Sequence, residues 1–531
     1  MFSLKNIRPF KKFYPPRVAD KSVINTKRKE IADNYFVCGD CKLKKNKFGL
    51  WDMYINVSGF EAGVKNGILT KELAYFQEDS FMKRIKELVP STFYLKFLRM
   101  FVGIFNRNIA LHVPDEYKKE IYGVSLSASP DFNFVSKPYF RMLNYHAAHD
   151  IGHALQNMNM VYCTAFGVKG DKTDDGKMLI GRNFDLYIGD DFALNKIVTF
   201  VNPDKGHKFV SIGWASMIGV ISGMNEKGLT ITYNSAKSAI PFSAKTPVSI
   251  LARKILQYAS NIDEAYQIAK EYKTFVSGAF FVSSASEKRF VILEKTTKNL
   301  DIFESGTDVL IQTNHFQSNK FKNTKLNLKN IEESSSMYRW ERTQELINKK
   351  QKHSIITVAE MLRDQKGKND EHIGIGNEKA INQLIGHHSI IFKPEELKFW
   401  ISSHPYQLGC YVAYDMNKVF DNPEEFGLEI YEESQNIPED SFMHTEEFIN
   451  FKDFRTETHR LEKLLKKKNH GITEEHINKY IKSNPNYYQA LYVAGLYYKS
   501  LGNKEKANEL FHNALSRQIP WLSDRRKIEN S

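Results

Sequence analysis

Short runs of β-forming residues dominate the middle of the chain, and they constrain its fold more than any other feature. From Met160 to Ala236 these runs are separated by Gly, Asp and Asn turns: "VYCTAFGV", "KMLIGRNFDL", "NKIVTFVNP", "FVSIGWASMIGVISGMN" and "GLTITYNSA". The connection "DKTDDGK" (171–177) has the composition of a hairpin loop. A helical pattern at 247–272 precedes four more β-type runs, "GAFFVSS", "RFVILEK", "LDIFES" and "VLIQTNHF". Blocks of strands that alternate with blocks of helices predict layered sheets flanked by helices, an α+β fold.

The chain is long enough for more than one structural unit, since 531 residues exceed one ordinary core. Composition and periodicity divide it into a basic lead-in (1–48), a helical segment (49–162), a strand-rich core (163–450) and a helical C-terminal extension (451–531). Within the core, helices are predicted at 336–349 and 356–364. Small and aromatic residues of 484–520 have the spacing of a tetratricopeptide-like helix pair, which leaves a protein partner open for the extension.

The charge balance is basic, with 75 Lys and Arg against 62 Asp and Glu and a net charge of +13. Basic runs near both ends are typical of solvated faces, and no nucleic-acid-binding module accompanies them. We therefore expect no nucleic-acid partner, whereas weak contact with a membrane surface stays open. The basic N-terminus lacks the apolar stretch of a secretory signal, which predicts a cytoplasmic protein.

Two groups of residues have the types that bind metals, but neither has the spacing of a known site. Cys38 and Cys41 form a "CGDC" pair without a second pair, and we interpret it as a surface turn. The stretch "YHAAHDIGHALQ" places His146, His149, Asp150 and His153 at helical spacing, without an HExxH pattern. We predict a polar helix that packs over the site. Neither a metal nor an organic cofactor is expected.

Cys163, in the first of the β-type runs, has neighbours that suggest chemistry. A thiol at neutral pH needs a base or a positive charge beside it to become a nucleophile. Cleavage of the Tyr162–Cys163 peptide bond would give Cys163 a free α-amine, with a pKa of about 8, next to its own side chain. Charged and amide side chains that could fix this amine and stabilise an oxyanion follow on the next runs, namely Arg182, Asn183, Asp185, Asn234 and Asn314.

The sequence resembles the N-terminal-nucleophile hydrolases of the acyl-coenzyme A:6-aminopenicillanic acid acyltransferase type over residues 49–420. It is more distantly similar to penicillin V acylases and bile salt hydrolases. The segments that carry the resemblance are "SGFEAGVKNG", "CTAFG", "GKMLIGRNFDL", "GMNEKGLTITYNSA", "TNHF" and "SSSMYRWERTQEL". The resemblance implies a four-layer αββα sandwich, made as a precursor that its own nucleophile cleaves into two associated chains.

The resemblance also implies roles for individual residues. Cys163 would be the nucleophile and, through its new α-amine, the base. Asp185 would hold that amine or orient the cleft. Asn314 would donate its side-chain amide to the oxyanion, with Asn234 at the same pocket. Arg339 would add positive charge beside the thiolate or bind substrate.

Three further residues complete the predicted site. Arg182 and Tyr233 are expected on the substrate side, although Arg182 has the alternative of a structural pair with an acidic neighbour. Tyr162 precedes the nucleophile where the penicillin acyltransferase has a glycine. This bulky residue restricts the backbone distortion that self-cleavage requires.

These observations predict an enzyme that forms an acyl–Cys163 thioester from a small-molecule amide, such as an N-acyl amino acid, and passes the acyl group to water or to an amine. Two alternatives stay open. One is an unprocessed, non-catalytic protein that recruits a partner through its C-terminal helices. The other is an acyl-lipid hydrolase at a membrane surface.

Overall fold

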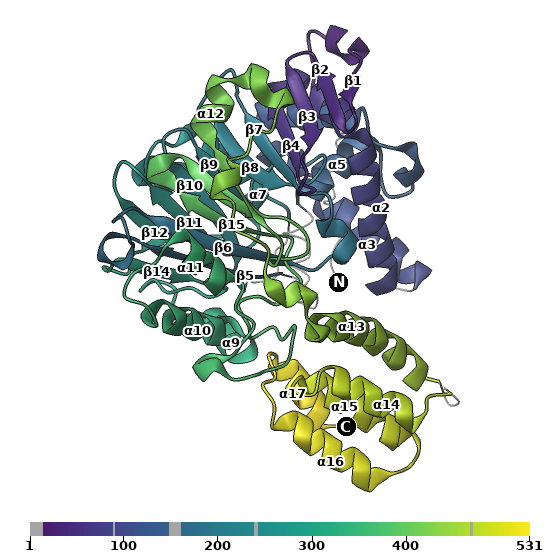
Figure 1. Ribbon diagram of the computed structural model, residues 1–531. Coiled ribbons are helices and arrows are strands. Elements are labelled where there is room, and N and C mark those ends of the chain that lie inside the picture. Colours follow the sequence, from purple (N-terminus) through teal and green to yellow (C-terminus); the bar gives the residue numbers. More distant parts are fainter. Residues whose placement is uncertain (1–13, 89–90, 148–160, 238–242, 468–470) are drawn as a thin grey trace.

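The computed structural model describes residues 14–88, 91–147, 161–237, 243–467 and 471–531, and Figure 1 shows the arrangement of their elements. The described strands form two sheets, of 11 and 6 strands. In the larger sheet, the strands in spatial order are β1 (Lys29–Ala32), β2 (Tyr35–Cys38), β3 (Cys41–Lys45), β4 (Trp51–Ile55), β7 (Ile197–Val201), β8 (Phe209–Gly213), β9 (Ser222–Asn225), β10 (Leu229–Ser235), β11 (Gly278–Ser284), β12 (Arg289–Lys295) and β13 (Leu300–Phe303). In the smaller sheet they are β14 (Val309–Gln312), β5 (Val161–Val168), β6 (Leu179–Leu186), β15 (His388–Lys393), β16 (Lys398–Ser402) and β17 (Tyr411–Asp415).

The two sheets pack face to face, with apolar side chains of both between them. Ile180 and Ile390 of the smaller sheet belong to the same buried cluster as Phe200, Phe281 and Ile292 of the larger one. Because side chains alternate between the two faces of a strand, each sheet has a second apolar face that other elements must cover. Helices cover both of these outer faces.

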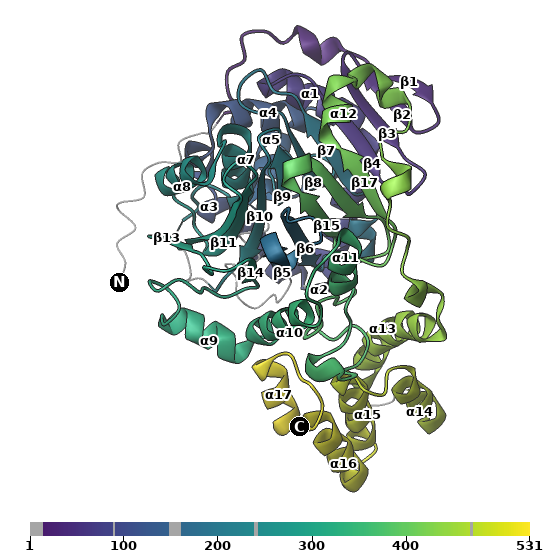
Figure 2. The ribbon, with the colours of Figure 1, turned by 60° about the vertical axis from the view of Figure 1, so that its left-hand side comes forward.

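The outer face of the larger sheet carries α7 (Val248–Tyr258) and α8 (Ile262–Glu271), which contact β9 to β12. The outer face of the smaller sheet carries α10 (Ser336–Asn348) and α11 (Ile355–Leu362), which contact β5, β6, β14 and β15 (Figure 2). The layers therefore run helices, sheet, sheet, helices. The predicted α+β class is confirmed, and so are the helices predicted at 336–349 and 356–364.

The segment before the nucleophile contributes five described helices along one side of the sheets: α1 (Gly59–Leu69), α2 (Lys71–Leu88), α3 (Thr92–Phe105), α4 (Asp115–Ser125) and α5 (Pro138–His146). Helices α1 and α4 approach closely because glycines form the contact. A Cβ on Gly63 would lie 1.9 Å from the carbonyl oxygen of Glu120. None of the helices in the described ranges has both the length and the apolar character needed to cross a membrane.

The first residues of the chain differ from the predicted lead-in. Strands β1 to β3 lie in it and extend the larger sheet at one edge. Cys38 and Cys41 lie opposite each other in the β2–β3 hairpin, as free thiols. Both are fully buried, whereas the turn between them is exposed. The interpretation of the cysteine pair as a surface turn was therefore wrong for the two thiols. Lys65 of α1 lies over this turn, where a Cβ on Gly39 would come within 3.1 Å of its Nζ.

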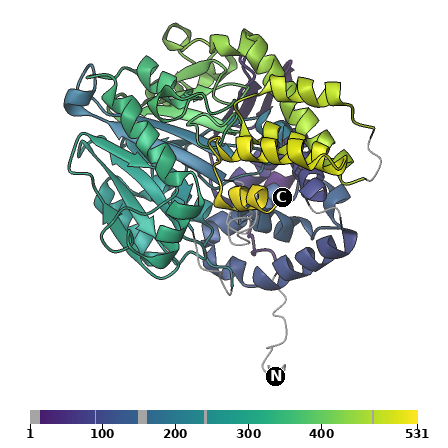
Figure 3. The same ribbon diagram turned by 90° about the horizontal axis from the view of Figure 1, so that it is seen from below.

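The C-terminal part is helical, as Figure 3 shows from below. The helices that follow the sheets are α12 (Met416–Asp421), α13 (Glu446–Leu465), α14 (Glu474–Ser483), α15 (Tyr488–Ser500), α16 (Lys504–Leu515) and α17 (Leu522–Glu529), and α9 (Lys325–Glu333) precedes α10. Helices α15 and α16 form a close pair in which Phe511 lies against Gly495. The assignment of this pair to the tetratricopeptide class stays a prediction.

Candidate active site

Cys163 lies on β5, which pairs antiparallel with β6 from Val161–Leu186 to Val168–Leu179. Its side chain is fully buried. Residues that lie opposite each other in this ladder share a face, so Cys163 and Phe184 point between the two sheets. Tyr162 and Asp185 form the next pair and point to the opposite face. The nucleophile candidate and the carboxylate candidate are thus neighbours along the hairpin but lie on different faces.

Arg182 is the charged group nearest to the thiol. Its Nη2 lies 3.5 Å from Cys163 Sγ and donates to the carbonyl oxygen of Tyr233 at 2.6 Å. The guanidinium is fully buried, and among the described residues no carboxylate lies within ion-pair distance of it. Burial raises the pKa of the Cys163 thiol above its ordinary value, and the charge of Arg182 opposes this rise. The alternative of a structural ion pair for Arg182 therefore finds no partner in the part of the chain described.

The other terminal nitrogen of Arg182 contacts a chain of neutral side chains, those of Ser222, His388 and His387. Arg182 Nη1 donates to Ser222 Oγ at 2.7 Å and lies 3.4 Å from His388 Nε2. Since the guanidinium can only donate, His388 Nε2 accepts, and its Nδ1 carries the proton that bonds His387 Nδ1 at 2.9 Å. His387 then carries its own proton on Nε2. Burial lowers the pKa of His387 to about 3, so this chain stays neutral at physiological pH.

The backbone of Cys163 is held by two side chains from other elements. Asn314 Oδ1 accepts the Cys163 N–H at 3.1 Å, and Arg339 Nη1 donates to the Cys163 carbonyl oxygen at 2.7 Å. Arg339 Nη2 also donates to Asn314 Oδ1, at 2.7 Å. Both neighbours of that atom are donors, which fixes it as the amide oxygen. The Nδ2 of Asn314 donates to the Ser235 carbonyl oxygen at 2.9 Å.

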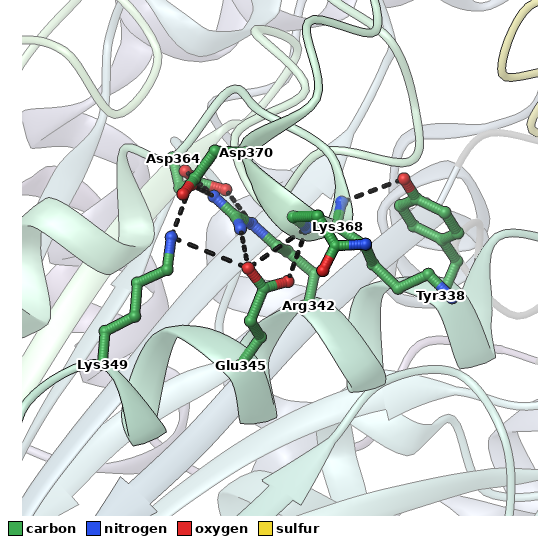
Figure 4. A network of polar contacts seen from close by, with 8 residues as sticks. Tyr338, Arg342, Glu345, Lys349, Asp364, Lys368 and Asp370 are labelled. Atoms are coloured by element: carbon green, nitrogen blue, oxygen red, sulfur yellow. Dashed lines mark hydrogen bonds and ion pairs between the residues drawn. The ribbon is translucent and has the colours of Figure 1, made fainter.

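Arg339 is positioned by the rest of α10. One helical turn further, Arg342 donates to both oxygens of Asp364, at 2.9 and 2.8 Å, and to Glu345 and Asp370 (Figure 4). Tyr338 OH accepts the backbone N–H of Lys368 at 3.0 Å. These bonds fix α10 to the segment that follows α11. They therefore set the position from which Arg339 reaches Cys163.

Asp185 is fully buried on the face of β6 that points to the helices. It accepts the Gln407 side-chain amide at 2.9 Å, and Gln383 Nε2 lies 3.5 Å from its other oxygen. Burial raises the pKa of Asp185 to about 7, although Arg339 and the Gln407 amide lower it. Its ladder partner is Tyr162, the residue before the nucleophile.

Asn234 and Tyr233 are neighbours on β10, so their side chains point to opposite faces of the larger sheet. Asn234 Nδ2 donates to the carbonyl oxygens of Gln312 and Thr313, at 3.2 and 3.1 Å, and so ties β10 to the end of β14. The ring of Tyr233 packs against Phe280 in the core beneath α7. Only the carbonyl oxygen of Tyr233 reaches the site, through Arg182.

The predicted histidine helix is described only in part. His146 ends α5 and is buried; its Nδ1 bonds the Met142 carbonyl oxygen at 2.8 Å, and its Nε2 accepts the Ile218 N–H at 3.0 Å. The first bond lies within α5, and the second ties the end of α5 to the connection between β8 and β9. His149, Asp150 and His153 lie outside the described residues. Within the described part of the chain, no group of three or more His, Cys, Asp or Glu is arranged to hold a metal ion.

Several residues of this arrangement were not predicted from the sequence: Ser222, His387, His388, Gln383 and Gln407. The adjacent histidines of "GHHSIIF" at the start of a β-type run are a signal that could have been noticed. The two glutamines come from irregular segments, where the sequence carries no comparable pattern.

Comparison with known proteins was made on sequence and on structure. Residues 171–405 match the family model of acyl-coenzyme A:6-aminopenicillanic acid acyl-transferase. The predicted resemblance to this acyltransferase family is thus confirmed for that region, which begins after Cys163. An uncharacterized protein of Archaeoglobus fulgidus is 26% identical over 267 residues, which are 46% of this chain. The alignment spans 43% of the length of that relative.

Three solved structures are similar at a low level. An N-acylethanolamine-hydrolyzing acid amidase ortholog of Caenorhabditis elegans has 15% identity and a TM-score of 0.31, over 44% of this chain and 93% of its own. A mutant conjugated bile acid hydrolase of Clostridium perfringens has 15% identity and a TM-score of 0.34, over 48% and 93%. Penicillin V acylase of Agrobacterium tumefaciens has 14% identity and a TM-score of 0.33, over 48% and 87%. Similarity at this level establishes nothing about this chain by itself.

Proposed function

We propose that this chain, whose residues 171–405 resemble the acyltransferase family, is an N-terminal-nucleophile hydrolase that cleaves itself before Cys163 and then hydrolyses small-molecule acyl amides. One observation carries the proposal. The amide N–H, the carbonyl oxygen and the Sγ of Cys163 each meet a different side chain, those of Asn314, Arg339 and Arg182. A structural cysteine on a buried strand needs none of these contacts.

The first reaction is the cleavage of the chain. Cys163 Sγ attacks the carbonyl carbon of Tyr162, the C–N bond to Cys163 breaks, and the acyl group is transferred to sulfur as a thioester. The Cys163 nitrogen takes up the thiol proton and leaves as an amine. Water then hydrolyses the thioester, which releases the Tyr162 carboxylate and restores the thiol. Arg182, 3.5 Å from Sγ, favours the thiolate in this step.

The new α-amine lies beside groups suited to hold it. Asn314 Oδ1 already accepts the Cys163 nitrogen and can continue to do so after cleavage. Asp185 faces Tyr162 across the ladder, so departure of Tyr162 uncovers this carboxyl next to the amine. An ammonium group there would lower the pKa of Asp185 again. This role matches the one predicted for Asp185.

The second reaction repeats the first on an external amide. The α-amine takes the thiol proton, Sγ attacks the acyl carbon, and the amine returns the proton to the leaving amine. The oxyanion develops next to the guanidinium of Arg182, because the Nδ2 groups of Asn234 and Asn314 are bonded to backbone carbonyls. Transfer to an amine in place of water would use the same groups.

A panel of substrates tests the proposal. The wild type is expected to hydrolyse N-acyl amino acids and to leave phospholipids intact, whereas Cys163→Ala removes the activity. Cys410→Ser is the matched control, because Cys410 is partly exposed and lies outside the site. Activity that survives in Cys163→Ala, or a preference for phospholipids, would contradict the proposal.

A second candidate is an unprocessed protein that acts through its C-terminal helices. The observation in its favour is that Val161 to Val168 pair in unbroken register with β6, so the Tyr162–Cys163 bond lies in regular strand. A chain that stays intact and inactive on every acyl amide would support this candidate.

A further inference from the structure

The side chain of Tyr162 fills a niche that the C-terminal extension closes. Its ring lies 4.5 Å from that of Trp521, at an interplanar angle of 41°. Tyr162 is 8% exposed, and its hydroxyl has no hydrogen-bond partner among the described residues. The aromatic contact, and not the hydroxyl, therefore accounts for the fit of this side chain.

Trp521 is held in place by the docking of the extension on the segment that follows α11. Asn377 Nδ2 donates to the Gln518 carbonyl oxygen at 2.9 Å, three residues before Trp521. Asn484 Nδ2 donates to the Ile375 carbonyl oxygen at 2.9 Å, and Tyr487 OH donates to Glu378 at 2.9 Å. Trp521 itself precedes α17, which contacts α9 and lies on the side of the C-terminal helices nearer the sheets in Figure 1. It also lies outside the region that matches the acyltransferase family.

We propose that the niche of Tyr162 becomes the acyl-group subsite of the processed protein, and that Trp521 selects a flat aromatic acyl group. This inference rests on the proposed function. In self-cleavage the atom attacked by Sγ is the carbonyl carbon of Tyr162. An external substrate must bring its own carbonyl carbon to the same Sγ, so its acyl group extends into the space that Tyr162 leaves.

The composition of the niche narrows the class of acyl group. A phenyl ring on Trp521 gains the same contact as Tyr162 without burying an unpartnered hydroxyl. Glu378 and Asp524 accept from the hydroxyls of Tyr487 and Tyr488. Burial is the main cause that raises the pKa of the Tyr162 hydroxyl, and both carboxylates raise it further. Their charge disfavours an acyl group that ends in a carboxylate. The niche thus fits an uncharged aryl-acyl group better than a flexible aliphatic or an acidic one.

The experiment compares N-phenylacetylglycine with N-hexanoylglycine, which share a leaving group and have acyl groups of similar size. The processed wild type is expected to prefer the phenylacetyl substrate by about tenfold in kcat/KM. Trp521→Ala should bring the ratio close to one by slowing only the aromatic substrate, and Trp521→Phe should keep most of the preference. Tyr498→Phe, which loses the bond to Glu474 at the start of α14, is the control for a loosened extension and should leave the ratio unchanged.

The outcomes separate this inference from the proposed function. An enzyme that depends on Cys163 but prefers the hexanoyl substrate, or keeps its preference in Trp521→Ala, would overturn the inference and leave the proposed function standing. A chain that is neither cleaved nor active on either amide would overturn both. If Trp521→Ala does not fold, the inference is still tested by the kcat/KM ratio of the wild type and by its retention in Trp521→Phe.

Discussion

Arg339 and Arg342 lie one turn apart on α10, and both are buried, yet their surroundings are opposite. Arg342 donates to three carboxylates, those of Glu345, Asp364 and Asp370. Arg339 donates to the neutral oxygens of Cys163, Thr164 and Asn314, and no carboxylate of the described residues is within ion-pair distance. Burial lowers the pKa of Arg339 to about 10, whereas the carboxylates raise the pKa of Arg342 above its ordinary value.

The charge of Arg342 stabilises the fold through its ion pairs, whereas the buried charge of Arg339 lowers the stability of the fold. A buried cation without a counter-ion is unfavourable, and such groups are typical of functional sites. Arg182 repeats the pattern of Arg339 on the other face of the hairpin. Two buried guanidinium groups, neither with a carboxylate of the described residues at ion-pair distance, therefore flank Cys163, where an anionic sulfur or oxygen would form during a reaction.

The largest expected effect is on activity. Arg339→Met should lower kcat/KM by about a thousandfold, while the melting temperature changes little. The group lost fixes the carbonyl oxygen of Cys163 and the Oδ1 of Asn314, which would accept the new α-amine, and it holds positive charge beside them. Arg339→Lys keeps the charge but loses the fork that bonds Cys163 and Asn314, and should lower kcat/KM by about tenfold. Steady-state kinetics and calorimetry on the same preparations measure both quantities. A large loss of stability with normal activity in Arg339→Met would contradict the functional role given to Arg339.

Arg342→Met should lower the stability of the protein and not its activity. It leaves the Asp364 carboxylate, which is 12% exposed, without the cation that donates to both of its oxygens. The free energy of unfolding should therefore fall by about 3 kcal/mol, measured by denaturant titration. The double variant with Asp364→Leu should regain much of this loss, since it removes both charges. A double variant as unstable as the single one would contradict the assignment of the pair.

Asp185 should make stability depend on pH. Because burial raises its pKa to about 7, the folded state binds the proton more tightly than the unfolded chain does. Its contribution to stability is therefore present below the usual pKa of 3.8 and is lost as the pH rises through 7. In a Cys163→Ala background, Asp185→Asn should reduce the loss of stability between these pH values.

Asp52 provides the control for this measurement. Burial raises the pKa of Asp52 to about 7 as well, and its carboxylate is bonded to Asn46 and Tyr414 and to none of the site residues. Asp52→Asn should remove a separate part of the pH dependence of the free energy of unfolding. Its effect should therefore add to that of Asp185→Asn. An Asp185→Asn profile that is identical to that of the parent would show that this carboxyl does not titrate as described.

The smallest expected effect concerns Tyr162. In the Cys163→Ala background, Tyr162→Phe should raise the free energy of unfolding by about 1 kcal/mol, because it removes an unpartnered hydroxyl and keeps the contact with Trp521. Tyr411→Phe is the matched control. It loses a bond to Ser389 Oγ of 2.6 Å and should lower stability by about the same amount. Equal effects of the two variants would contradict the description of the niche.

Much of the hairpin that carries Cys163 could be predicted from local sequence. The alternation of "VYCTAFGV" and "KMLIGRNFDL" around a turn of Asp and Gly specifies two paired strands, and these place Arg182 and Asp185. Strands β1 to β3 were missed because they have only four or five residues each, and because β1 and β3 carry lysines. Such composition is common in edge strands and is also typical of loops.

The parts of the site that were not predicted come from contacts between distant segments. The orientation of Asn314 depends on two donors, Cys163 N–H and Arg339, which lie 151 and 25 residues away. The ring of Tyr233 faces away from the site because of strand register, which the sequence of β10 does not specify by itself. Trp521 reaches Tyr162 only through the docking of the extension, for which no local pattern exists.

The mass of the purified protein, combined with N-terminal sequencing, shows whether Cys163 becomes an N-terminal nucleophile. We expect two associated fragments, of which the second begins with Cys163, and an intact chain for Cys163→Ala. A wild-type chain that remains whole while it hydrolyses acyl amides, or a cut at another bond, would contradict this expectation.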